Sequence, residues 1–373
     1  MPFVPSAGSP PGFCVKAMRV AIDTNALYVT RAGVARYVRG LMRGLKEPDV
    51  SACALLPVAW EVDNFGYDQP ARALKTAFRE LIWARWLAPR RLAAAGTELL
   101  HSTSEALITP PASMAHVVTL HDLALLRHPE RFRRWQRVAS ARRLQRLAGV
   151  DHVICISRFT ADEAMRLLGL PMSKLSVVHN GCDLLAAEAG ELLAATIATK
   201  EFFLFVGSLE PGKNLALLRT VWNTAAAAGQ PLPPLLIAGT RWLGVPGEGP
   251  PPAGWHFLGH VPDADLAWLY RKALALVFPS KYEGFGLPVL EAMGRGCPVI
   301  CSRVGSLPEV GGEAAWWCEL DAASYLAALR ECARNGLERD AFVQAGPAQA
   351  RKFSWTKCAA ETVAVYRRVL GSR

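Results

Sequence analysis

The fold of this 373-residue chain is decided by the stretch Phe278-Pro-Ser-Lys-Tyr-Glu-Gly-Phe-Gly-Leu-Pro-Val-Leu-Glu-Ala-Met-Gly294. The stretch is typical of a buried strand end, a glycine-bearing turn and a helix that Pro288 opens, because proline favours the first helical position. Backbone N–H groups at a helix start have no partner within the helix. We therefore expect those around Gly286 to Val289 to face the space beyond the strand and to bind an anion.

Two glutamates flank this predicted anion site. Glu283 lies in the turn and Glu291 in the first helical turn. Two carboxylates can hold hydroxyl groups on either side of a diphosphate, and a nucleotide-sugar has that layout of ribose, two phosphates and hexose. The spacing alone carries little information, because exposed helix glutamates are usually only solvated.

Strand-like and helical patterns alternate on both sides of this stretch, which is typical of a parallel sheet with helices on its faces. The predicted strands cover residues 19–23, 117–120, 153–156, 175–178, 202–206, 235–238, 273–278 and 298–301. The predicted helices cover residues 35–45, 160–168, 215–228 and 287–295. The pattern stops in an alanine-rich stretch and then restarts. We therefore expect an α/β protein with two doubly wound, Rossmann-like domains whose strand ends face a shared cleft.

The length of the chain also favours two domains, because one hydrophobic core rarely holds this many residues. We expect a flexible leader over residues 1–17 and an N-terminal, acceptor-side domain over residues 18–190. A C-terminal, donor-side domain would cover residues 191–352. The final helix, residues 353–373, would cross back to the first domain.

Composition excludes several classes of protein. Hydrophobic residues make up 51% and charged residues 20% of the chain, which is typical of a well-packed protein and not of a disordered one. Nine cysteines without a C-x-x-C pair fit neither a disulfide framework nor a zinc site, and this favours a cytoplasmic location. No run of 18 apolar residues is present, so we expect no membrane-spanning helix.

The formal net charge of +10 attracts polyanions in general. Two basic stretches contain aromatic residues: residues 72–91, with Trp83 and Trp86, and residues 131–146, with Phe132 and Trp135. They are either solvated helix faces whose aromatic rings lie in the core, or a face that binds an anionic membrane surface peripherally. Nucleic acid is not an expected partner, because no motif that reads bases accompanies the charge.

The surrounding residues make the glutamate pair informative. Residues 279–293, with Glu283 and Glu291 as an E-x7-E motif, resemble the family 4 (group 1) glycosyltransferases, and most closely their bacterial mannosyltransferase branch. The resemblance extends over most of the chain, with the pieces in fitting order. The other matching pieces are Ile22-Asp23, Gly33-Val-Ala-Arg-Tyr37, Thr119-Leu-His-Asp122, Ile156-Ser-Arg-Phe159, His179-Asn-Gly181, Val206-Gly-Ser-Leu-Glu-Pro-Gly-Lys-Asn214, Leu258-Gly259, Ser306-Leu-Pro-Glu-Val310 and Phe353-Ser-Trp355.

The resemblance implies a GT-B enzyme that transfers a sugar from a nucleotide-sugar with retention at the anomeric carbon, without a metal or another cofactor. Glu291 would bind the ribose, Glu283 would hold the donor sugar, and Lys213 would neutralise the departing diphosphate. The catalytic residues would then be His121, Lys213 and Glu283, with Asp122 as a further candidate. The donor-binding residues would be Gly33, Ser208, Lys213, Gly239, Val261, Glu283, Gly284, Phe285, Gly286, Leu287 and Glu291.

Gly212 departs from the family pattern, because many relatives carry an arginine directly before the lysine that corresponds to Lys213. One positive charge at the diphosphate would then be missing. Arg158, Arg303 or Arg241 are candidates to replace it.

The mannosyltransferase branch implies GDP-mannose as the donor and a glycan or a lipid-linked acceptor in surface polysaccharide synthesis. One alternative is a same-fold catalyst, such as a nucleotide-sugar epimerase or a phosphorylase. Another is a non-catalytic sugar-nucleotide binding protein, which the missing arginine favours. The presence of His121, Lys213, Glu283 and Glu291 together argues for the transferase.

Overall fold

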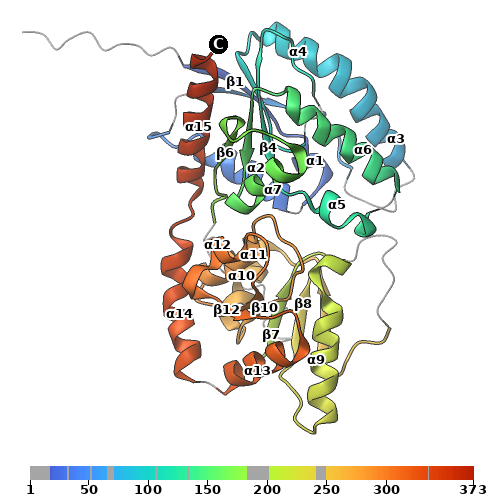
Figure 1. Ribbon diagram of the computed structural model, residues 1–373, viewed down its shortest axis with the longest axis vertical. Helices are drawn as coiled ribbons and strands as arrows, with labels where there is room; N and C mark the ends of the chain where they lie inside the picture. Colours follow the sequence, from blue (N-terminus) through green and yellow to red (C-terminus); the bar gives the residue numbers. More distant parts are fainter. Residues whose placement is uncertain are drawn as a thin grey trace, which may run out of the picture.

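Two six-stranded parallel sheets form two domains that lie one above the other, as the alternating pattern predicts (Figure 1). The computed structural model describes residues 17–31, 33–50, 53–64, 71–105, 108–132, 134–182, 201–240, 249–334 and 336–373. The expected leader, apart from Ala17, and the expected domain boundary at residues 190 and 191 lie outside the described residues.

The N-terminal sheet has the strand order β2-β1-β3-β4-β5-β6. Its strands are β1 (Met18–Asp23), β2 (Cys53–Val58), β3 (Leu99–Ser102), β4 (Ala115–Leu120), β5 (His152–Cys155) and β6 (Leu175–Val177). Its helices are α1 (Ala26–Val29), α2 (Gly33–Gly44), α3 (Arg72–Phe78), α4 (Ala88–Ala95), α5 (Ala124–Arg127), α6 (Arg134–Gln145) and α7 (Arg158–Leu168). The shorter or irregular turns are the π-helix η1 (Arg79–Leu87) and the 3-10 turns η2 (Pro129–Arg131), η3 (Arg146–Gly149) and η4 (Met172–Lys174).

The C-terminal sheet has the strand order β12-β11-β10-β7-β8-β9. Its strands are β7 (Phe203–Val206), β8 (Leu235–Ala238), β9 (Trp255–Gly259), β10 (Leu276–Phe278), β11 (Val299–Ser302) and β12 (Trp316–Cys318). Its helices are α9 (Leu215–Ala227), α10 (Asp263–Lys272), α11 (Leu287–Gly294), α12 (Leu307–Gly311), α13 (Ala322–Ala333) and α14 (Leu337–Ala350), with 3-10 turns η5 (Pro211–Lys213) and η6 (Gly312–Ala314).

The central strands of both sheets are buried on both faces, because helices cover each side. Every residue of β4, β5, β7 and β10 is buried, which explains why β7 and β10 are continuous apolar runs. Strands β2, β3, β9 and β12 were not predicted from the sequence. Of these, β2, β9 and β12 lie at sheet edges, and β3 contains the polar residues His101 and Ser102.

The last helix, α15 (Trp355–Gly371), runs along the N-terminal domain and packs against α2 (Figure 1). The indole ring of Trp355 lies so close to Gly40 that a Cβ on that glycine would stand 2.1 Å from it. Gly44 and Gly181 meet the backbone of Trp355 as closely, at 2.4 and 2.2 Å from their would-be Cβ positions. These glycines form the notch into which Trp355 fits.

Candidate functional site

The two loops that carry Lys213 and Glu283 meet at the point where the strand order of the C-terminal sheet reverses. The chain runs from β7 through β8 to β9 on one side and places β10 on the other side of β7. Such a switch point leaves a crevice beyond the strand ends, and it is the usual ligand site of a doubly wound sheet. The ammonium group of Lys213 forms an ion pair with the carboxylate of Glu283 beyond these strand ends, although the residues are 70 positions apart.

Helix α11 begins beside this pair. Gly286 is the residue before the helix and has φ = +98°, which a residue with a side chain rarely adopts, and a Cβ there would stand 2.6 Å from Leu307. Pro288 lies in the first turn, as expected. The N–H group of Val289, however, donates to the carbonyl oxygen of Gly286 at 3.0 Å, so it is not free as the sequence suggested. Glu291 begins the second helical turn, not the first.

Gly284 is held between two loops of the N-terminal domain. A Cβ on Gly284 would stand 2.2 Å from the carbonyl oxygen of His121 and 2.7 Å from Cβ of Asp122. On its other side, the hydroxyl group of Ser157 donates to the carbonyl oxygen of Gly284 at 2.8 Å. The turn between Glu283 and Gly286 therefore touches the N-terminal domain directly, and only glycine fits at position 284.

His121 follows β4 and lies at this contact between the domains. Its Nε2 donates to the carbonyl oxygen of Thr103 at 2.8 Å, because a carbonyl oxygen can only accept. Burial lowers the pKa of His121, against the hydrogen bond to Thr103 and the nearby charge of Asp122, which raise it. The imidazole is therefore neutral near pH 7, with its proton on Nε2 and an acceptor lone pair on Nδ1. Asp122 uses Oδ1 to accept from the backbone N–H of Ala124 at 2.9 Å.

Glu291 pairs with an arginine of the opposite domain. The guanidinium of Arg36, on α2, forms ion pairs with Glu291 and, at 2.7 Å, with Asp263. The hydroxyl group of Tyr270 donates to the second carboxylate oxygen of Glu291 at 3.1 Å. A pocket between the domains contains these side chains and is also lined by Arg39 and Leu287. A ribose bound at Glu291 would have to displace Arg36 or share the carboxylate with it.

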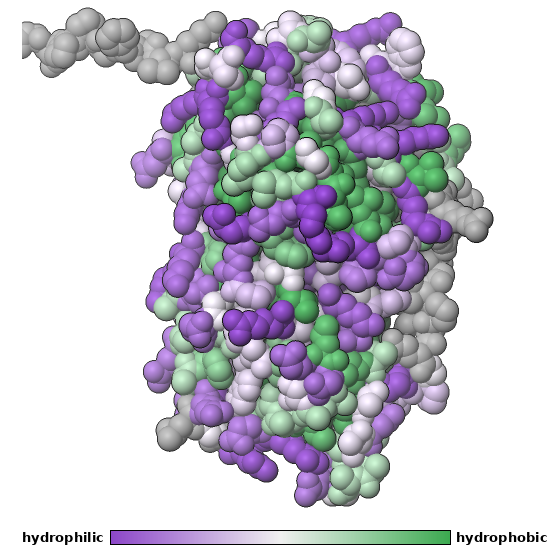
Figure 2. All heavy atoms as spheres, viewed as in Figure 1, coloured by the Kyte–Doolittle hydropathy of each residue, from purple (hydrophilic) through white to green (hydrophobic). Residues whose placement is uncertain are grey.

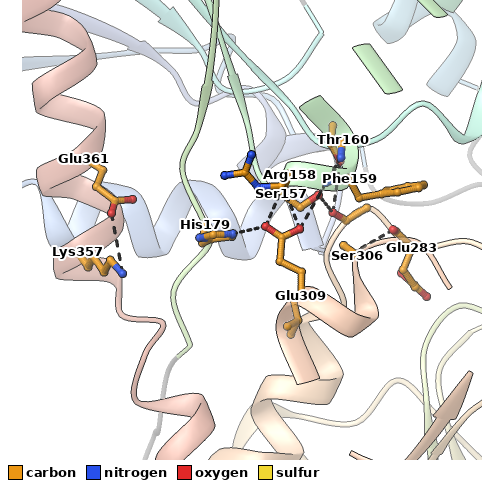
Figure 3. A network of polar contacts seen from close by, with 12 residues as sticks. Ser157, Arg158, Phe159, Thr160, His179, Glu283, Ser306, Glu309, Lys357 and Glu361 are labelled. Atoms are coloured by element: carbon orange, nitrogen blue, oxygen red, sulfur yellow. Dashed lines mark hydrogen bonds and ion pairs between the residues drawn. The ribbon is translucent and has the colours of Figure 1, made fainter. Parts of the chain in front are cut away.

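Glu309 joins three of the sequence pieces that resemble the family (Figure 3). Its carboxylate, on α12, accepts the backbone N–H of Arg158 at 2.9 and 3.0 Å, at the start of α7. It also accepts from Nε2 of His179 at 2.6 Å. Burial raises the pKa of Glu309, but these hydrogen bonds outweigh burial and hold that pKa below its ordinary value. The charged carboxylate thus links the C-terminal domain to the positive end of an N-terminal helix.

The space beside Gly212 is filled by an arginine that the sequence analysis did not single out. Arg131, in η2 of the N-terminal domain, donates to Glu210 through Nε at 3.1 Å and through Nη2 at 2.6 Å. A Cβ on Gly212 would stand 2.1 Å from Cζ of Arg131. In the sequence, the only sign of this arginine is Gly212 itself, which stands where many relatives carry an arginine. That sign suggests a guanidinium from elsewhere beside Lys213, but it does not identify Arg131.

Two of the three arginines proposed to replace the missing charge make other contacts in the part of the chain that the structure describes. The side chain of Arg158 is exposed, and only its backbone N–H takes part in the contact with Glu309. Arg303 is also exposed and lies over the ring of Trp317, at 6.0 Å from its centroid. Arg241 lies outside the described residues.

The remaining predicted donor residues make separate packing contacts. Gly33 begins α2, and a Cβ there would meet Leu287 of α11 at 3.9 Å. Gly239 follows β8, and its would-be Cβ lies 1.8 Å from the carbonyl oxygen of Gly207, next to Ser208. Val261 packs against the core of the C-terminal domain, and Phe285 is buried in that core. Within the described ranges, no group of three or more His, Cys, Asp or Glu side chains could hold a metal ion.

A face of the N-terminal domain combines exposed apolar and basic side chains. Figure 2 shows hydrophobic residues among hydrophilic ones where α3, α4 and α6 lie. Trp83 is buried, but Trp86 is 61% exposed, so only one of the two tryptophans lies in the core. We define the basic–apolar face by the exposed residues Leu74, Leu81, Ile82, Arg85, Trp86, Leu87, Arg90, Arg91, Val138, Arg142 and Arg146. Among the described helices, none is long and apolar enough to cross a membrane.

Comparison with known families gives a match over both halves of the chain. The model of Glycosyltransferase Family 4 matches residues 31–184, and that of Glycosyl transferases group 1 matches residues 194–349. The chain is 32% identical over 268 aligned residues to the O-antigen chain mannosyltransferase B of Escherichia coli, an alignment that covers 67% of this chain and 70% of that protein.

Solved structures share the arrangement of the two domains. Sucrose-phosphate synthase from Thermosynechococcus elongatus superposes with a TM-score of 0.69 and 18% identity, over 95% of this chain and all of that one. HepE from Anabaena, solved with UDP and glucose, superposes with a TM-score of 0.67 and 16% identity, over 94% of this chain and all of that one. These likenesses confirm the GT-B fold that the sequence predicted.

Proposed function

The chain belongs to the family 4, group 1 glycosyltransferases, and we propose that it is a retaining hexosyltransferase that uses a nucleotide-sugar donor and no metal. The observation that carries the proposal is the convergence of Lys213, Glu283 and the start of α11 at the switch point of the C-terminal sheet, with the backbone of His121 against the same turn from the other domain. This arrangement offers a cation, a carboxylate and a helix N-terminus to one diphosphate-sugar.

The proposed reaction breaks the bond between the anomeric carbon of the donor sugar and the β-phosphate oxygen. The electron pair leaves with that oxygen, and Lys213 neutralises the charge that develops there. The acceptor hydroxyl oxygen bonds to the anomeric carbon on the same face, and its proton passes to the departing phosphate oxygen. The products are the glycosylated acceptor and a nucleoside diphosphate. Fixed donors in a site that excludes water stabilise such developing charge strongly.

The proposed donor is GDP-mannose, and the proposed acceptor is a glycan or a lipid-linked glycan of surface polysaccharide synthesis. The similarity to an O-antigen chain mannosyltransferase supports both parts of this proposal. The structural likeness to a protein solved with UDP makes UDP-sugars the alternative donors to test.

Nucleotide binding tests the donor proposal. We expect GDP to raise the thermal unfolding temperature of the protein more than UDP or ADP does, because a ligand that binds only the folded state stabilises it. Guanosine without phosphates should have a small effect, since it cannot reach Lys213. If no nucleoside diphosphate shifts the unfolding temperature, the nucleotide-sugar proposal is wrong; a larger shift with UDP would replace GDP-mannose by a UDP-sugar.

We also propose that the protein works on the cytoplasmic side of the membrane, attached through the basic–apolar face. Exposed apolar side chains can enter the lipid interface, while the arginines around them attract anionic headgroups. Such a surface would bring the N-terminal domain next to a lipid-linked acceptor.

Vesicle flotation tests this attachment. We expect the protein to float with vesicles of anionic phosphatidylglycerol and less with neutral phosphatidylcholine. The double substitution Leu81→Ser and Trp86→Ser should abolish flotation, because both side chains are more than 45% exposed. A matched control is Phe257→Ser on the C-terminal domain, where a 44% exposed aromatic side chain is removed. Wild-type protein that stays in the bottom fraction with anionic vesicles would refute the attachment.

A further inference from the structure

The turn that ends at Lys213 is held by Glu210 of the same domain, and Glu210 is held in turn by Arg131 of the opposite domain. Glu210 accepts the backbone N–H of Gly212 at 2.7 Å and thereby caps the 3-10 turn η5, which ends at Lys213. The Glu210 side chain is 1% exposed. A carboxylate that is buried to this degree requires a cation, because burying an unpaired charge is costly. Arg131 provides it by donating two hydrogen bonds to the two carboxylate oxygens.

The guanidinium of Arg131 and a side chain at position 212 exclude each other. A Cβ on Gly212 would stand 2.1 Å from Cζ, 2.3 Å from Nη2 and 2.5 Å from Nη1 of Arg131. All three distances are far below van der Waals contact. Gly212 thus leaves room for a cation that comes from the N-terminal domain.

One nitrogen of the Arg131 guanidinium finds no hydrogen-bond acceptor in the described part of the chain. Nη1 is buried and donates to no atom of the described residues, although Nε and Nη2 are both used. A buried N–H group without an acceptor is uncommon and invites a ligand atom. The group lies against Gly212, the residue directly before Lys213, and a diphosphate oxygen would satisfy it.

We propose that Arg131 is a positioning residue for the diphosphate: from across the cleft it neutralises Glu210, fixes the turn that carries Lys213, and offers Nη1 to the donor. The proposal rests on the proposed function, because it assumes that Lys213 meets a diphosphate. It gives this enzyme a diphosphate site that is complete only while the two domains are in contact. Separation of the domains removes Arg131, leaves Glu210 unpaired, and thereby favours release of the nucleoside diphosphate product.

Calorimetric binding of GDP and of guanosine to the full chain tests the proposal. We expect Arg131→Ala to weaken GDP binding by roughly 10- to 100-fold, as for the loss of a hydrogen bond to a charged group. Guanosine, which has no phosphates, should bind as it does to the wild type. Equal weakening of both ligands would indicate a merely structural role and would overturn the proposal, and so would unchanged GDP affinity.

A second substitution separates the negative charge of Glu210 from its hydrogen bond to the N–H of Gly212. Gln at position 210 can still accept the N–H of Gly212 but carries no charge. The double variant Arg131→Ala with Glu210→Gln should therefore bind GDP about tenfold more tightly than Arg131→Ala alone, because contacting residues are not additive. A double variant that binds no better than Arg131→Ala contradicts the role of Arg131 in neutralising Glu210.

The controls keep the outcome interpretable. Arg373→Ala removes another arginine that packs on the N-terminal domain, one that pairs with Asp151 just before β5, at the end of the sheet opposite the strand ends of the site, and should leave GDP affinity unchanged. If Arg131→Ala does not fold, Arg131→Gln serves for the same comparison. Failure of wild-type protein to bind any nucleoside diphosphate would refute the proposed function, and the inference with it. Binding by the wild type with equal binding by the Arg131 variant would refute the inference alone.

Discussion

Replacing Lys213 with alanine is expected to lower kcat by roughly 100- to 1,000-fold, which is the usual cost of removing one fixed group that stabilises developing charge. The ammonium group is the only cation that pairs with Glu283 among the described residues, and both side chains are largely buried. Without it, the departing diphosphate and the carboxylate of Glu283 would face each other unneutralised. Steady-state kinetics with the donor identified by the binding panel measures the loss.

Two further variants identify the cause of that loss. Lys281→Ala removes an exposed lysine from the loop that carries Glu283 and should leave kcat within about twofold of the wild type, as surface substitutions usually do. Glu283→Gln should also lower turnover strongly, and the double variant should lose less than the product of the two single losses, because the residues are paired. A Lys213→Ala enzyme with near-normal kcat would show that another group neutralises the leaving phosphate.

Gly284→Ala is the second change for which we expect a large effect. The new methyl group would stand 2.2 Å from the carbonyl oxygen of His121, and a backbone atom cannot yield as a flexible side chain can. The loop of His121 and the turn of Glu283 would have to move apart. A displacement of about 1 Å at a reacting centre can lower the rate roughly 100-fold, so we expect a loss of that size in kcat/KM.

The structural control for this substitution is Gly149→Ala. A Cβ on Gly149 meets no atom within 4 Å, and that variant should keep its activity. Both variants should retain the circular dichroism spectrum of the wild type, since neither change lies in a strand. Full activity in Gly284→Ala would mean that the tight contact between the two loops is not needed during turnover.

The central strands and the crevice at the switch point were predictable from the sequence because their signals are local. Buried parallel strands such as β7 and β10 consist of continuous apolar runs, and a strand end followed by glycine and proline marks the start of α11. Strands at the sheet edges, such as β2 with its Pro57, carry a weaker signal and were missed.

The contacts between the domains were not predictable, because they join residues far apart in the chain. Arg36 with Glu291, Arg131 with Glu210, and Glu309 with the start of α7 are separated by 255, 79 and 151 positions. In the sequence, Arg131 resembles a solvated surface charge, and the family pieces that contain the other charged residues do not reveal their partners. Only the folded arrangement shows that they are paired across the cleft.

Transfer of radiolabelled sugar from a panel of nucleotide-sugars to membranes of the source organism measures the proposed reaction itself. We expect wild-type protein to move mannose from GDP-mannose into a lipid-extractable or polysaccharide product, and the Glu283→Gln variant to move none. Absence of both transfer and hydrolysis with every nucleotide-sugar of the panel would contradict the proposed function.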